Sequence, residues 1–182
     1  ADLTIVGNDV ITNGDTTFSS GASSQTDAFT LNIKDGVGAG AITSNSANDD
    51  WTAVTINSTG GTATAATNAN VVGALDLANG NTMQTLTVNA TSSLTTGAIV
   101  GWDTATAGVA NKGAITVTGA GKVNLNTLDN AVESLTASGN SGGVTVTLSN
   151  QTDFQYVGST GADIVTTGAV LSTATAAPGS VD

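Results

Sequence analysis

Apolar and polar residues alternate with a period of two in short runs along the whole chain. In Val144–Leu148, for example, every second residue is aliphatic and the residues between are threonines. Because successive side chains of a strand point to opposite faces, this pattern predicts strands with one buried face and one face of threonines toward water. We predict such strands at Leu3–Val6, Phe29–Ile33, Trp51–Asn57, Met83–Asn89, Ala114–Thr118, Val123–Leu125, Val144–Leu148, Phe154–Val157 and Ile164–Thr166.

Glycine-rich turns separate these runs, among them Gly60-Gly61 and Ser141-Gly142-Gly143. Such residues tolerate positive φ and end strands. Thr, Val and Ile recur throughout and favour strands, whereas helix formers are scarce. The sequence therefore predicts an all-β class. The segment Ala74–Ala78 is compatible with either a short helix or a buried strand.

One strand motif recurs at irregular distances. Its central aliphatic residue is Val54, Leu86 and Leu135 in three copies, which gives offsets of 32 and 49 residues. A β-solenoid, similar to a parallel β-helix, with turns of variable length would produce such offsets, and so would chance similarity between strands of a low-complexity chain. We favour the solenoid, with a β-sandwich as the alternative, because sandwich strands also recur between glycine turns. A single domain is expected over residues 1–173, followed by a flexible tail over residues 174–182.

Composition excludes many functions. The 182 residues contain no Cys, no His and no Arg, and 14 acidic groups against three lysines give a net charge of −11. Thiol and imidazole catalysis are therefore absent, and nucleic acid and anionic lipid are repelled. No run approaches the length of a membrane span, so we expect no membrane insertion. Gly139-Asn140-Ser141-Gly142-Gly143 fits a nucleophile-elbow pattern but lacks the His that such a serine needs, so we expect no enzyme.

The segment Gly158–Thr166 matches a calcium-binding pattern. In the nonapeptide G-G-x-G-x-D-x-U-x of parallel β-rolls, U is a large aliphatic residue. Gly158, Gly161, Asp163 and Val165 fill four of its five specified positions, and Ser159 replaces the second glycine. Carboxylate oxygen is a ligand that Ca²⁺ prefers. The alternative is a tight Gly-x-Asp turn before a strand.

Two further places carry acids that could hold Ca²⁺. Gly7 and Asp9 belong to a fainter copy of the nonapeptide near the start of the chain. Asp49 and Asp50 are adjacent in a polar loop, where both side chains could reach one ion. Their alternative is a pair of solvated loop carboxylates.

A family resemblance emerges from the segments 113–125, 132–148 and 154–166. Their succession of Thr-Val-Thr-Gly, Leu-Thr, Gly-Val-Thr-Val and Gly-x-x-Gly-Ala-Asp-x-Val resembles surface-layer proteins of Gram-negative bacteria, of the type-I-secreted, RTX-related kind. The resemblance implies a stacked β-fold, export without an N-terminal signal, and Ca²⁺-dependent assembly into a lattice on the cell surface. Members of that family are longer and carry tandem nonapeptides, whereas the nonapeptides here are isolated.

We therefore expect a calcium-stabilised, non-enzymatic, extracellular structural protein whose partner is itself, in a sheet or a filament at the cell surface. The alternative is an adhesin or carbohydrate-binding β-module, for which Trp51, Trp102, Phe154 and Tyr156 are the candidates for contact with cell-surface glycan. With so few aromatic residues in the chain, we expect most of these four to be core anchors instead. Thr-x-Thr pairs on the strands suggest a third possibility, binding to ice. Because ice binding needs threonines aligned from turn to turn, the irregular offsets argue against it.

Overall fold

The computed structural model describes residues 2–6, 12–13, 16–18, 28–36, 38–44, 51–60, 69–77, 82–103, 113–149 and 154–167. These residues form strands and connecting loops, and no helix lies among them. The predicted all-β class is confirmed. Ala74–Ala78 contains the short strand β9 (Leu75–Asp76) and not a helix over its described residues.

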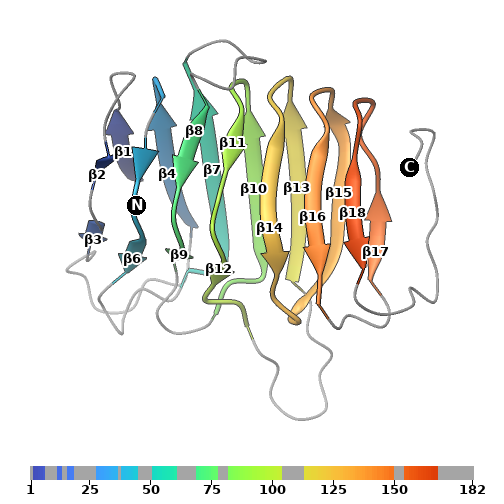
Figure 1. Cartoon of the computed structure of the whole chain (residues 1–182). Coiled ribbons are helices and arrows are strands. Elements are labelled where there is room, and N and C mark those ends of the chain that lie inside the picture. The colour runs from blue at the N-terminus through green and yellow to red at the C-terminus, as the bar shows by residue number, and fades with distance from the viewer. Residues whose placement is uncertain are drawn as a thin grey trace.

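Within the described chain the strands form three sheets (Figure 1). Sheet A contains, in spatial order, β1 (Asp2–Val6), β4 (Ala28–Lys34), β7 (Ala53–Thr59), β10 (Thr85–Ala90), β13 (Gly113–Gly119), β15 (Val132–Asn140) and β17 (Gln155–Val157). Sheet B contains β2 (Thr12–Asn13), β5 (Gly38–Ala39), β8 (Asn70–Val72), β11 (Leu94–Thr95), β14 (Val123–Leu128), β16 (Val144–Leu148) and β18 (Ile164–Thr167). Sheet C contains β3 (Thr16–Phe18), β6 (Ile42–Ser44), β9 and β12 (Ile99–Val100).

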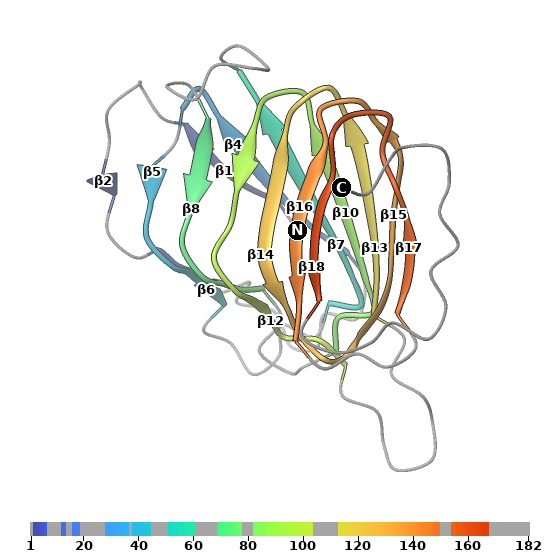
Figure 2. The ribbon, with the colours of Figure 1, turned by 45° about the vertical axis from the view of Figure 1, so that its right-hand side comes forward.

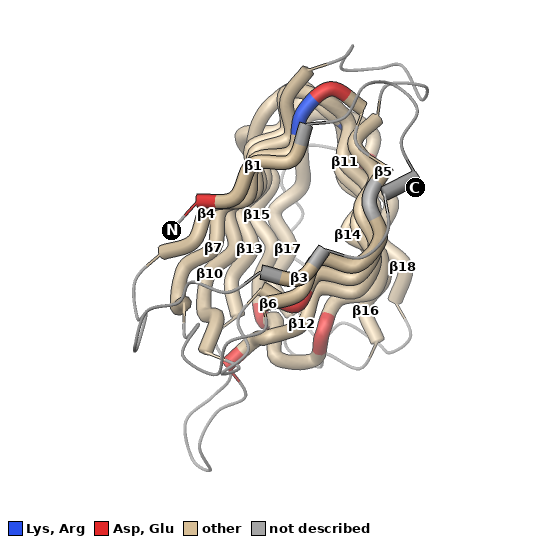
Figure 3. Tube along the Cα trace, turned by 90° about the vertical axis from the view of Figure 1, so that its left-hand side faces the viewer, with Lys and Arg blue, Asp and Glu red and all other residues tan. Residues whose placement is uncertain are grey.

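The chain visits the sheets in a fixed order. It passes from sheet A to sheet B and, in the first four circuits, to sheet C before it returns to sheet A. Neighbouring strands within each sheet are parallel. Figure 2 shows sheets A and B as two facing layers, and Figure 3 looks along the stack, with sheet C closing one side of the cross-section.

The circuits differ in length. In-register residues of sheet A are separated by 28, 25, 32, 29, 20 and 21 residues in successive circuits. The last described circuits are shorter because they contribute to sheets A and B alone. Val54 pairs with Leu86, and Leu135 lies two strands beyond Leu86, with Ile115 between them. The recurrent motif therefore marks equivalent positions, and its offset of 49 residues spans two circuits.

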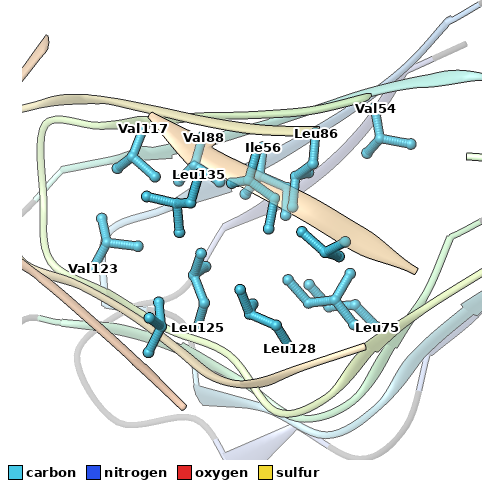
Figure 4. Close-up of a cluster of buried hydrophobic side chains, with 14 of the residues drawn as sticks. Val54, Ile56, Leu75, Leu86, Val88, Val117, Val123, Leu125, Leu128 and Leu135 are labelled. Atoms are coloured by element: carbon cyan, nitrogen blue, oxygen red, sulfur yellow. The ribbon is translucent and has the colours of Figure 1, made fainter. Parts of the chain in front are cut away.

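Aliphatic side chains from all three sheets fill the space between the layers (Figure 4). Val54, Leu86 and Leu135 point inward from sheet A toward Leu125 of sheet B and Leu75 of sheet C. The strands of sheet A alternate buried and partly exposed residues, as in β7. Burial of about 25 cal/mol per Å² of apolar surface makes this column of inward residues the main source of stability.

Candidate functional site

Asp163 lies at a corner between sheets A and B, on the loop that connects β17 to β18. Its side chain is only 5 % exposed. Its Oδ1 accepts hydrogen bonds from the Val144 backbone N–H at 2.8 Å and from the Ser159 hydroxyl at 2.6 Å. Its Oδ2 accepts a hydrogen bond from the Ser159 backbone N–H at 2.8 Å. The carboxylate therefore holds its own loop together and ties this loop to the preceding circuit.

The glycines of this corner allow two loops to stack closely. A Cβ at Gly161 would lie 2.5 Å from the Gly143 nitrogen, and a Cβ at Gly143 would collide with the Ala162 carbonyl oxygen. Gly143 also has φ of +95°, a conformation that an L side chain disfavours. The spacing Gly-x-Asp is therefore explained by contact between successive circuits.

Ionisation of Asp163 reflects two opposing effects. Burial on its own raises the pKa of this carboxyl, but the hydrogen bonds from Ser159 and Val144 favour the charged form and hold the pKa below its usual value. Burial and the nearby charge of Asp163 raise the pKa of Tyr156. The buried Tyr156 hydroxyl makes no hydrogen bond of acceptable geometry within the described residues. Asp163 therefore remains a charged acceptor at neutral pH, beside a neutral phenol.

Buried asparagines at other corners make similar hydrogen bonds to backbone groups. These residues were not predicted from the sequence. Asn140 is 1 % exposed, and its Oδ1 accepts hydrogen bonds from the Gly142 and Gly143 backbone N–H groups at 3.1 and 2.8 Å. Asn70 is fully buried; it donates to the Ser58 hydroxyl at 2.8 Å and accepts from the Gly36 backbone N–H at 3.1 Å. Asp163 belongs to this series of polar corner residues. The sequence signal that could have identified these corner residues is a short polar side chain close to a glycine turn.

The surroundings of Asp163 do not fit a cation. Its oxygens face N–H and O–H donors, whereas Ca²⁺ requires several oxygen acceptors around it. Ser159, which stands where the nonapeptide has glycine, supplies two of the three donors. Among the described residues no group of three or more acidic side chains could hold a metal. The other predicted ligands, Gly7, Asp9, Asp49 and Asp50, lie outside the described residues, as does the predicted tail over residues 174–182.

The four aromatic residues named as candidates for glycan contact are buried, which confirms the expectation that most of them are core anchors. Trp51, Trp102, Phe154 and Tyr156 are 0, 2, 1 and 8 % exposed. Trp51 stacks on Phe29 with ring centroids 4.6 Å apart. The Trp102 indole N–H donates to the Ile99 carbonyl at 3.0 Å. These side chains pack in the core because their large apolar surfaces gain most from burial.

A shallow hollow of about 390 Å³ lies on the outer surface of sheet B. Val71, Leu94, Asn124 and Thr145 line it, and Lys122 is the charged residue at its rim. Its lining residues include neither a carboxylate nor an aromatic ring. Lys122 is the one ionisable side chain among the lining residues, so they contain no pair of ionisable groups for acid–base chemistry.

A polar ladder crosses the outer face of sheet A and was not expected from the sequence. Thr118 donates to Asn89 Oδ1 at 2.8 Å, Asn89 donates to Asn57 Oδ1 at 2.9 Å, and Asn57 donates to Asn32 Oδ1 at 2.8 Å. Asn32 continues the series toward the Thr4 hydroxyl at 3.4 Å. All donors point toward β1, so the side-chain dipoles align. The ladder links four successive strand pairs through their side chains.

Comparison with family models, curated proteins and solved structures finds no match to this chain. Among the described segments there is no helix with the length and hydropathy needed to cross a lipid bilayer. The assignment of function therefore rests on the residues and their arrangement.

Proposed function

We propose that this chain is a β-solenoid that serves as a self-assembling, non-enzymatic structural protein at the cell surface. The repeated A–B–C order and the parallel pairing support the solenoid over a sandwich, since Greek-key sandwiches pair their strands antiparallel. The alternating threonine face, the low content of charged side chains and the surface-layer resemblance support a structural role. Export and surface location rest on that resemblance and on the Asp-, Thr- and Gly-rich composition.

The observation that carries self-assembly is the state of the two ends of sheet A. Within the described chain, β1 pairs only with β4 and β17 pairs only with β15. The two edges run in the same direction and lie at opposite ends of the stack (Figure 1). The β17 edge of one copy can thus accept β1 of a second copy and extend the parallel sheet.

The described edge strands lack two residue types that hinder such pairing. Neither β1, β17 nor β18 contains Lys or Pro, the residues that commonly block edge-to-edge addition. Ile164, on the terminal strand β18 of sheet B, is 55 % exposed. A head-to-tail contact whose rotation does not close a ring repeats into a filament, and addition of β1 to the β17 edge is such a contact in this proposal.

In this proposal the candidate calcium ligands are residues outside the described part of the chain. Asp163 is satisfied by protein donors, so no step of assembly is assigned to an ion at that corner. Asp9, Asp49 and Asp50 are the residues to test.

The test is assembly of purified protein, followed by light scattering and negative-stain microscopy in EDTA and then in millimolar CaCl₂. Ile164→Lys places a charge on the terminal strand and is expected to prevent filaments. Val71→Lys is the matched control, because Val71 is an aliphatic residue of the same sheet, 45 % exposed but on the interior strand β8.

Filaments from the native chain and from Val71→Lys, but not from Ile164→Lys, would support end-to-end assembly. Equal assembly of both variants would place the contact elsewhere. A native chain that stays monomeric in both solutions would contradict self-assembly. Assembly that is indifferent to EDTA would remove calcium from the proposal and leave the structural role intact.

A further inference from the structure

Five threonines form an unbroken column on the outer face of sheet A. The register joins residues of β4, β7, β10, β13 and β15 in order, and these are Thr30, Thr55, Thr87, Thr116 and Thr136. The differences in circuit length are therefore absorbed outside this column. The expectation that irregular offsets would misalign the threonines is wrong.

The hydroxyl groups of this column are not used in bonds between the strands. Within the described residues, none of the five side chains donates or accepts a hydrogen bond. In the neighbouring column, by contrast, Asn32, Asn57 and Asn89 use their amides in the ladder. The two columns lie two residues apart on the same strands. The ladder thus occupies the amides of its own column, while the threonine hydroxyls stay without a partner among the described residues.

The column is rigid and regular. Register is continuous from β1 to β13, and the shifts lie between β13 and β15, on either side of the Thr116–Thr136 pair. Parallel strands place equivalent residues about 4.8 Å apart, and alternate residues of one strand about 6.6 Å apart. Threonine is stiff at χ1, so each hydroxyl and each methyl group keeps its direction.

The face is also nearly free of charge. Asp2 stands at the β1 end of the threonine column, and Glu133 lies near the start of β15. Lys34 ends β4. In Figure 3 the strands of sheet A are otherwise drawn in the colour of uncharged residues. A charged macromolecule would find few complementary groups here, whereas a neutral, periodic ligand would find a regular array of hydroxyls.

We propose that the outer face of sheet A, along the threonine column, binds ice. The two spacings of this face, about 4.8 Å between strands and about 6.6 Å along a strand, are of the same order as the spacings between water molecules on the faces of an ice crystal. Each threonine offers a hydroxyl that can replace one lattice water and a methyl group that excludes liquid water beside it. The adjacent Asn ladder widens the face without adding charge. This binding is independent of the proposed self-assembly.

The test is partition of the full-length chain into slowly growing ice, together with the difference between its freezing and melting temperatures. The monomeric state is imposed with Ile164→Lys, so that failure to assemble and failure to bind ice are separate results. Thr87→Lys, in the centre of the column, is expected to abolish enrichment in ice. Thr145→Lys is the matched control, since it places the same charge on the outer face of sheet B.

Circular dichroism and thermal unfolding establish that each variant is folded. Thr116→Lys provides a second variant, because Thr116 is already exposed and its replacement leaves the core intact. Enrichment of the native chain and of Thr145→Lys, with loss in both column variants, would support the proposal. A native chain that remains in the liquid overturns it.

Two other results would also overturn the proposal. Enrichment that survives both Thr87→Lys and Thr116→Lys would place ice binding on another surface. Co-sedimentation with crystalline cellulose or chitin, sensitive to Thr87→Lys and without enrichment in ice, would assign the face to polysaccharide.

Discussion

The backbone N–H of Val144 donates a 2.8 Å hydrogen bond to Oδ1 of Asp163, nineteen residues later in the chain. Val144 begins β16, and Asp163 directly precedes β18. These two strands pair with each other. The carboxylate therefore satisfies a backbone group at the start of one strand and positions the next. Ser159 contributes two further hydrogen bonds to Asp163. Together the three hydrogen bonds join the last two described circuits.

Replacement of Asp163 tests how much these three hydrogen bonds contribute to stability. Asp163→Ala removes all three hydrogen bonds and leaves buried N–H groups without an acceptor, so we expect a loss of about 3 kcal/mol in the free energy of unfolding. Ser159→Ala removes the hydroxyl alone and should cost about 1 kcal/mol. Urea unfolding measures both. Equal stability of Asp163→Ala and the native chain in EDTA would contradict the structural role of the carboxylate.

Acid should weaken the same hydrogen bonds, because it protonates the Asp163 carboxylate. The folded-state pKa of Asp163 is lowered from 3.8, so its contribution to stability is present above that pH and is lost as the pH falls through the folded-state value. Unfolding midpoints measured from neutral pH downward should fall more steeply for the native chain than for Asp163→Asn. Burial raises the pKa of Asp76, which acts in the opposite sense, so Asp76→Asn should make the decline steeper.

Stacking of the corners makes Gly143 intolerant of a side chain. Its φ of +95° opposes alanine, and so does the Ala162 carbonyl oxygen, which occupies the space that a Cβ would need. We expect Gly143→Ala to lower the free energy of unfolding by about 2 kcal/mol or more. Gly139→Ala is the control, since its Cβ would first meet the Thr118 methyl group at 3.1 Å. Similar losses in both variants would contradict the stacked-corner explanation.

Alternation predicted the strands well because it depends on the residues of each strand alone. Val144–Leu148 has the predicted bounds, and strands lie at every other predicted position, with ends shifted by up to three residues. The recurrence of Val54, Leu86 and Leu135 also located equivalent positions. The strand β15 was the longest omission, because Glu133 and Ser138 interrupt its apolar pattern. The short strands β2, β3, β5, β6, β11 and β12 were not predicted either, because two or three residues are too few to show alternation.

The corner and surface arrangements could not be predicted in this way, because each depends on the neighbouring circuit. Gly158, Gly161 and Asp163 were singled out as calcium ligands, but the Ser159 donors that satisfy the carboxylate become visible only when the loop is folded. The alignment of Thr55, Thr87 and Thr116 requires the register, and circuit lengths of 32 and 29 residues conceal it.

The asparagine ladder makes a prediction about coupling between strands. Asn89 donates to Asn57 at 2.9 Å, and Asn57 in turn donates to Asn32. Asn57→Ala should cost about 1–2 kcal/mol, because it removes one donor and one acceptor. Because Asn89→Ala breaks the same Asn57–Asn89 bond, the double variant should cost less than the two single variants together. A double-mutant cycle by urea unfolding measures this coupling, expected at about 0.5–1 kcal/mol.

The matched cycle pairs Asn57→Ala with Thr145→Ala, on the outer face of sheet B. These residues share no hydrogen-bond partner within the described chain, so their effects should add. If the Asn57 and Asn89 variants were also additive, the amides would be independent surface groups. The strand separation on which the threonine column depends would then be fixed by the backbone hydrogen bonds alone. Coupling confined to the asparagine pair would instead show that the ladder holds the outer face in register.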